Sequence, residues 1–116
     1  MSKLLIDENS LLVIPSLAMK LGTNEALVLQ QIHYWLETSS HFIEGRKWIY
    51  NTYEDWQKQL PFLSVMTIKR TIWSLKKRGL LISANYNKLK MDKTKWYTID
   101  YECVKALYEK QTATME

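Results

Sequence analysis

The sequence has little cysteine, glycine or proline, and each scarcity excludes a class of protein. Its 116 residues include one cysteine, Cys103, so no disulfide can form within the chain. Three glycines and two prolines are too few for a flexible low-complexity linker. No apolar run approaches the roughly 18 residues of a membrane-spanning helix, and no secretory signal pattern precedes the polar run Asp7 to Ser10. We therefore expect one compact domain in the cytoplasm, without contact to a membrane.

Signatures of catalysis and of metal binding are also missing from the sequence. It shows no carboxylate pair at a suggestive spacing, no glycine-rich phosphate loop and no nucleophile with a matching base. A metal site would need His33, Glu37 and His41 to converge with a further ligand, and a solvent-facing or interfacial histidine is the simpler interpretation. We predict that the chain is not an enzyme and uses no metal, cofactor or small-molecule substrate.

One stretch, Ser64 to Gly79, is typical of a helix with both ends and both faces specified. Ser64 can cap the start by accepting from the N–H of Thr67, and Gly79 suits the left-handed position after the end. The last turn also carries basic side chains, which favour the negative end of the helix dipole. At 100° per residue one side of this helix is apolar, formed by Val65, Ile68, Ile72 and Leu75, and the opposite side is basic.

The basic side of this helix is predicted to be a DNA recognition surface. Arg70 is suited to a bidentate contact with guanine, whereas Thr67 and Lys69 can reach bases or phosphates. Trp73 can stack against sugar and groove wall or be covered by another subunit. The predicted contact residues of the recognition helix are Ser64, Met66, Thr67, Lys69, Arg70, Trp73, Lys76 and Lys77.

Charge is distributed unevenly along the chain. The net charge is +4, but residues 64–99 contain nine lysines and arginines against only Asp92, so this segment carries +8 and the remainder −4. A basic pole centred on the recognition helix favours a polyanionic partner. We therefore predict that double-stranded DNA is the partner.

The elements before Ser64 are predicted from caps and apolar periodicity. A short helix over Pro15 to Leu21 stops at Gly22, and Thr23 caps a longer helix to about Ser39 with an apolar stripe on one side. Lys47 to Asn51 forms a strand. Thr52 and Asp55 then start a second helix that Pro61 ends. Only three residues separate it from Ser64, which is the spacing of a helix-turn-helix.

The elements after Gly79 are predicted to be a β-hairpin and a last helix. The strands are Leu80 to Asn85 and Trp96 to Ile99, joined by a basic tip. Tyr86 and Trp96 are expected to anchor this wing in the core rather than to stack on bases. The last helix runs from Tyr101 to about Gln111. The wing lysines predicted to contact phosphates or the minor groove are Lys88, Lys90, Lys93 and Lys95.

These elements predict an α+β fold, a winged helix-turn-helix with a three-stranded antiparallel sheet, an N-terminal arm and a C-terminal helix. The expected divisions are an arm over residues 1–22, the DNA-binding domain over 23–100, and the last helix with its tail over 101–116. Apolar side chains off the main stripes predict a homodimer. The interface residues would be Leu27, Tyr34, Val104, Leu107 and Tyr108.

Four blocks in order carry a resemblance to a known family: NEALVLQQIHYWL, GRKWIYNTYEDWQ, TIKRTIWSLKKRGLL and YNKLKMDKTKWYTIDYE. From roughly Leu11 to Glu102 the chain resembles the N-terminal winged-helix region of DnaD-like replication initiators and replisome organisers of phages, plasmids and integrative elements of Gram-positive bacteria. The resemblance implies origin binding, assembly on the origin and recruitment of helicase-loading machinery. Such proteins usually continue into a C-terminal domain. We therefore expect either the DNA-binding part of a longer protein or a protein that binds DNA without the recruiting half.

Three functions stay open at this point. The first is a sequence-specific duplex binder in initiation of DNA replication, the second a small transcriptional regulator with the same fold, and the third a winged-helix scaffold for protein–protein assembly. The charge of residues 64–99 argues against the third, and only the family resemblance favours the first over the second.

Overall fold

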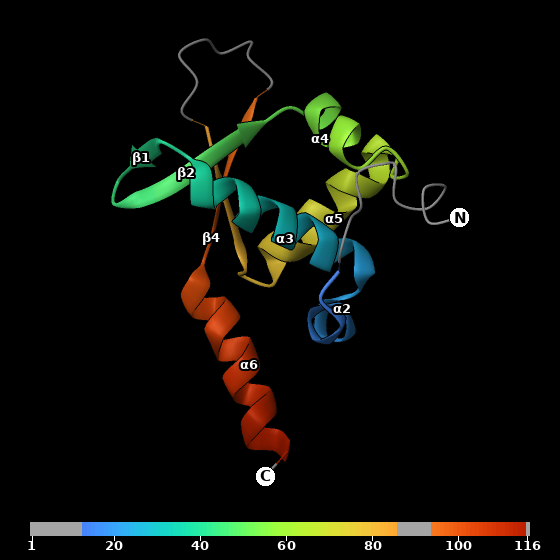
Figure 1. Cartoon of the computed structure of the whole chain (residues 1–116), viewed down its shortest axis with the longest axis vertical. Coiled ribbons are helices and arrows are strands. Elements are labelled where there is room, and N and C mark those ends of the chain that lie inside the picture. Colours follow the sequence, from blue (N-terminus) through green and yellow to red (C-terminus); the bar gives the residue numbers. More distant parts are fainter. Residues whose placement is uncertain (1–12, 86–93, 116) are drawn as a thin grey trace, which may run out of the picture.

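The computed structural model describes residues 13–85 and 94–115 as an α+β fold with five helices and a single antiparallel sheet of four strands (Figure 1). No helix in these two ranges is long and apolar enough to cross a membrane. In chain order the elements are α2 (Pro15–Leu21), α3 (Thr23–Thr38), β1 (His41–Ile43), β2 (Arg46–Asn51), α4 (Tyr53–Gln59), α5 (Val65–Lys77), β3 (Leu81–Ala84), β4 (Lys95–Ile99) and α6 (Tyr101–Met115).

The sheet has the strand order β1-β2-β4-β3, so the prediction of three strands was wrong by one. The additional strand, β1, pairs with β2 across a two-residue turn formed by Glu44 and Gly45. Both turn residues have positive φ, 53° and 81°, as in the type I′ turns that match the twist of a hairpin. The indole N–H of Trp48 donates to the carbonyl of Ile43 at 3.1 Å and ties the two strands together.

The start of α3 differs from the sequence prediction by one residue. Gly22, not Thr23, is the cap, and no side chain caps this helix end. The two helices α2 and α3 share Gly22, whose N–H donates to Ala18 at 2.7 Å and whose carbonyl accepts from Ala26 at 3.0 Å. The φ of Gly22 is 103°, a conformation that L side chains rarely adopt. Thr23 therefore becomes the first helical residue, because the chain turns from one helix directly into the next.

The ends of α4 and α5 confirm the capping predictions. The Thr52 hydroxyl accepts from the N–H of Asp55 at 3.1 Å, and the Asp55 carboxylate accepts from the N–H of Thr52, also at 3.1 Å. These hydrogen bonds hold the pKa of Asp55 below its usual value. Ser64 accepts from the N–H of Thr67 at 3.1 Å and starts α5.

A Schellman motif ends α5. The N–H of Gly79 donates to Lys76 at 3.0 Å, the N–H of Leu80 donates to Leu75 at 3.1 Å, and Gly79 has a φ of 79°. The chain then turns into β3 directly after the helix. Both ends of α5 are thus fixed by hydrogen bonds within the chain.

The core lies between one face of the sheet and the helices α3, α4 and α5, which cover it (Figure 1). Trp56 of α4 and Tyr97 of β4 are buried at its centre, with their ring centroids 6.0 Å apart. The predicted stripe of α3 is confirmed: Val28, Leu29, Ile32 and Leu36 are buried, and Trp35 packs partly buried against the same core. On the predicted apolar side of α5, Ile68, Ile72 and Leu75 are buried together with Thr71, whereas Val65 is only half-buried. The opposite side of the helix faces outward.

The last helix, α6, leaves the sheet at the end opposite to α4 (Figure 1), and its first half packs against the core through Val104 and Leu107. Asp100 accepts from the N–H of Cys103 at 3.2 Å at its start. The hydroxyl of Tyr101 lies 2.8 Å from Nδ1 of His33 on α3, which connects the first turn of α6 to the body of the fold. The helix continues to Met115, beyond the predicted end near Gln111.

Candidate nucleic-acid interface

The outward side of α5 carries the recognition-helix residues predicted from the sequence. Met66 and Trp73 are 61% and 60% exposed. The charged side chains of this side are also exposed: Lys69, Arg70, Lys76 and Lys77. Ser64 and Thr67 are engaged in the helix cap, where the Ser64 hydroxyl also donates to Oγ1 of Thr67 at 3.0 Å. The surface available for a partner is therefore formed mainly by the four cations, Met66 and Trp73.

Two of these lysines lie over aromatic rings. The ammonium nitrogen of Lys69 is 5.0 Å from the ring centroid of Tyr53, the first residue of α4, and that of Lys77 is 4.9 Å from the ring of Trp73. Cation–π contacts of this kind stabilise an exposed ammonium by about 0.5–1 kcal/mol and restrict its rotamers. Tyr53 and Trp73 thus hold two positive charges on the same side of the helix pair.

Carboxylates are missing from the described part of the basic segment. Residues 64–85 and 94–99 contain six cations and no aspartate or glutamate. No acidic side chain within these ranges offsets the cations, so this part of the segment carries only positive charge. The cations are Lys69, Arg70, Lys76, Lys77, Arg78 and Lys95.

The predicted wing is described only at its base. Strands β3 and β4 pair in antiparallel register, with Leu81 opposite Ile99 and Ala84 opposite Trp96. Lys95 is exposed at the start of β4. The predicted contacts Lys88, Lys90 and Lys93, and also Tyr86, lie outside the described residues.

Trp96 does not anchor the wing in the core, contrary to the prediction. Its neighbour Tyr97 points into the core, and successive side chains of a strand point to opposite faces. Trp96 therefore lies on the face away from the helices, where its ring is 4.9 Å from that of Tyr50 and 5.3 Å from that of His41. Because side chains alternate along β4, a position for Tyr97 in the core is enough to place Trp96 on the opposite face.

The predicted oligomer residues fall into two groups. Val104 and Leu107 are partly buried against the core of their own chain, and the ring of Tyr108 lies 4.6 Å from the ammonium of Lys20. Tyr34 is 63% exposed, and Leu27, seven residues earlier on α3, is half-buried. Of the five predicted residues, Tyr34 offers the largest exposed apolar surface.

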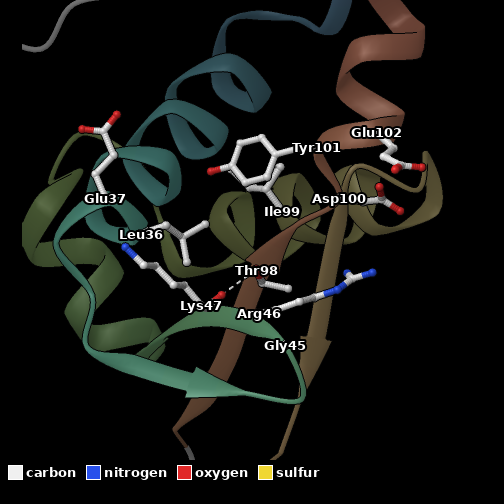
Figure 2. A pocket seen from close by; sticks show the side chains of 10 residues that line it. All are labelled: Leu36, Glu37, Gly45, Arg46, Lys47, Thr98, Ile99, Asp100, Tyr101 and Glu102. Atoms are coloured by element: carbon white, nitrogen blue, oxygen red, sulfur yellow. Dashed lines mark hydrogen bonds between the residues drawn. The ribbon is translucent and has the colours of Figure 1, made fainter.

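A hollow of about 580 Å³ lies where β2, β4 and the start of α6 meet (Figure 2). It is lined by cations and carboxylates together, with Arg46 and Lys47 on β2 facing Glu37, Asp100 and Glu102. The N–H of Cys103 holds the pKa of Asp100 low, and Arg46 lowers it further. This mixture of charges favours no single class of anion or cation.

The histidines do not converge as a metal site would require. His33 pairs with Glu37 at 2.9 Å, whereas His41 packs against Tyr50 with ring centroids 5.1 Å apart. Among residues 13–85 and 94–115 no three His, Cys, Asp or Glu side chains lie close enough to hold a metal ion.

The sequence did not predict two contacts between elements. One is the contact between Lys69 of α5 and the ring of Tyr53 on the neighbouring helix. This contact depends on how α4 packs against α5, which the sequence does not specify. The other is β1, which places His41 beside Tyr50 and Trp96.

Comparison with known proteins adds no relative: no family model, curated protein or solved structure matches this chain.

Proposed function

We propose that this chain is a winged helix-turn-helix protein that binds double-stranded DNA through α5, in initiation of phage or plasmid DNA replication. The observation that carries the proposal is the outward side of α5, where four exposed cations surround Trp73 and no carboxylate occurs from residue 64 to residue 85. DNA phosphates supply most of the affinity of such surfaces, and exposed Arg and Lys side chains are what they require.

The arrangement of elements supports the same proposal. The short helix α4 and the longer α5 are joined by residues 60–64, and the hairpin β3–β4 follows α5 directly. In helix-turn-helix proteins the second helix enters the major groove while the first crosses the backbone. In this mode Arg70 would reach base edges, and Lys69, held over Tyr53, would reach a phosphate.

The role in replication rests on the resemblance to DnaD-like initiators, because the contacts expected of α5 would be the same in any helix-turn-helix protein that binds duplex DNA. A small transcriptional regulator would use the same surface. Footprinting of the chain across its own replicon separates the two roles: protection confined to a replication origin supports initiation, and protection confined to a promoter supports regulation.

Duplex binding itself is tested by the dependence of affinity on salt. Neutralising about 6 phosphates gives a slope near −5 when the logarithm of the binding constant is plotted against the logarithm of the salt concentration. A titration with a duplex oligonucleotide at several salt concentrations measures this slope. Absence of binding at low salt, or a flat response to salt, would refute the proposal.

One observation favours the assembly scaffold as a second candidate. Phe62 in the turn before α5 is 59% exposed, close in the chain to Met66, and Trp73 is exposed on the same helix as Met66. Large exposed apolar side chains are a feature of surfaces that bind proteins. A scaffold would bind its partner with little change between low and high salt, opposite to the behaviour expected for DNA.

A further inference from the structure

The side chains at the start of α5 differ in what they leave available to a partner. The Ser64 hydroxyl is engaged in the helix cap, where it accepts from the N–H of Thr67 at 3.1 Å and donates to Oγ1 of Thr67 at 3.0 Å. Thr67 itself is half-buried. Met66 lies between these two residues and is 61% exposed. The largest exposed side chain of the first turn is therefore an apolar thioether rather than a hydrogen-bonding group.

Met66 belongs to a stripe along the centre of the outward side of α5. With 3.6 residues per turn, Arg70 lies about 40° from Met66 around the helix, and Trp73 lies about 20° from Met66 in the other direction. Lys69 lies further round, where its ammonium nitrogen is 5.0 Å from the ring of Tyr53 on α4. In a helix-turn-helix the first helix crosses the DNA backbone, so Lys69 faces a phosphate. Met66 and Arg70 face the base edges.

An apolar side chain in the major groove has one matching feature among the base edges. Thymine presents a C5 methyl group there, whereas the other recognition groups are hydrogen-bond donors and acceptors. A thioether placed against the amino group of adenine or cytosine displaces the water that this group binds and offers it no comparable partner, which weakens binding. Contact with the thymine methyl removes apolar surface from water, which strengthens binding. The chemistry of Met66 therefore favours thymine.

We propose that Met66 selects thymine in the duplex bound by α5, through contact with the C5 methyl group. Arg70 follows one turn later on the same stripe, and its guanidinium suits guanine. The rise of the helix between these two residues is about 6 Å, close to two steps of about 3.4 Å between base pairs. The preferred site therefore has a thymine within about two base pairs of a guanine. This inference rests on the proposed duplex binding by α5 and adds the bases that the helix prefers.

Replacement of thymine by uracil tests the methyl contact, because it removes one methyl group and preserves base pairing. Selection with the full chain from a pool of duplexes with a random centre gives the preferred site. Each thymine of that site is then replaced in turn, and affinity is measured by fluorescence anisotropy. The loss of one buried methyl group corresponds to roughly fourfold weaker binding. We expect this loss at the thymine near the guanine and little change at other thymines.

Variants of Met66 assign the methyl contact to this side chain. Met66→Ala is too short for the contact, and Met66→Gln brings a polar amide of similar length, so both should bind thymine and uracil duplexes equally. Met66→Leu keeps an apolar side chain and should keep the preference. Arg70→Ala should also keep it while losing discrimination at the guanine. Met19→Ala is the matched control, because Met19 is a methionine 88% exposed on α2. Thermal unfolding verifies that each variant stays folded.

Several outcomes would overturn the inference while duplex binding stands. These are a preferred site without a thymine near a guanine, or equal binding of thymine and uracil duplexes by the wild-type chain. A preference for thymine that persists in Met66→Ala would assign the methyl contact to another residue. If Met66→Ala changed only the self-association seen in sedimentation, Met66 would belong to a protein interface. Absence of any duplex binding by the wild-type chain would instead refute the proposed function, and this inference with it.

Discussion

Arg70 and Lys95 carry the same charge but lie on different elements, and we expect their substitution by alanine to have different effects on DNA binding. Arg70 projects from the middle of α5, whereas Lys95 is the first residue of β4, at the base of the hairpin. Arg70→Ala should cost roughly 1–3 kcal/mol on the cognate duplex and relax discrimination at one base position. Lys95→Ala should weaken cognate and random duplexes alike and lower the salt slope by about 1. Competition titrations with both duplexes measure each effect.

Ile72→Ala is the control for stability in this series. Ile72 is on the buried side of α5, and its truncation should cost roughly 2–5 kcal/mol of unfolding free energy. The two cation variants should unfold at the wild-type temperature. If Arg70→Ala reduced binding to cognate and random DNA equally, α5 would not be the base-reading element.

At the scale of elements, Gly79 sets where α5 ends and β3 begins. Its φ of 79° is costly for a residue with a Cβ, although a Cβ there would meet only Sγ of Cys103, at an ordinary 3.8 Å. Gly79→Ala should therefore destabilise the fold by about 1–2 kcal/mol through backbone conformation rather than through a clash. Gly79→Asn should cost less, because Asn adopts left-handed conformations more readily. Chemical denaturation of both variants checks this order, and equal losses would contradict the conformational explanation.

The predictability of each element depended on whether its determinants are local. Ser64, Thr52 and Gly79 mark helix ends by hydrogen bonds within a few residues, and the structure has all three in the predicted places. Strand β1 has three residues and follows α3 by only two, so no alternation was long enough to reveal it. The cap at Gly22 was not predicted, because Gly22 ends α2 and starts α3 at once and has no side-chain hydroxyl to mark a helix start.

The candidate surfaces show the same difference between features set within one segment and features set by packing between segments. The basic side of α5 followed from a helical period, which one segment contains in full. Tyr53 under Lys69 and His41 beside Trp96 depend on the packing of separate elements, which periodicity cannot supply. Contacts between separate elements could therefore not be predicted from the sequence.

At the scale of the whole molecule, the fold restricts how two copies could associate. Val104 and Leu107 already pack against the core of their own chain, and Tyr108 lies beside Lys20. The exposed side of α3 around Leu27 and Tyr34 remains the predicted dimer surface. Stable interfaces bury roughly 1,200–2,000 Å² in total, so a dimer centred on Tyr34 would also have to bury the polar residues beside it.

Tyr34→Glu tests this surface directly. Because Tyr34 is 63% exposed, the substitution should change the unfolding free energy by no more than about 0.5 kcal/mol, yet two glutamates facing each other across a symmetric interface would repel. We expect the wild-type chain to sediment as a dimer at micromolar concentration and Tyr34→Glu as a monomer. Phe62→Glu, a similarly exposed aromatic residue in the turn before α5, is the matched control and should remain dimeric. A wild-type chain that is monomeric both with and without DNA would contradict the prediction, and the chain would then read a single half-site rather than a symmetric pair.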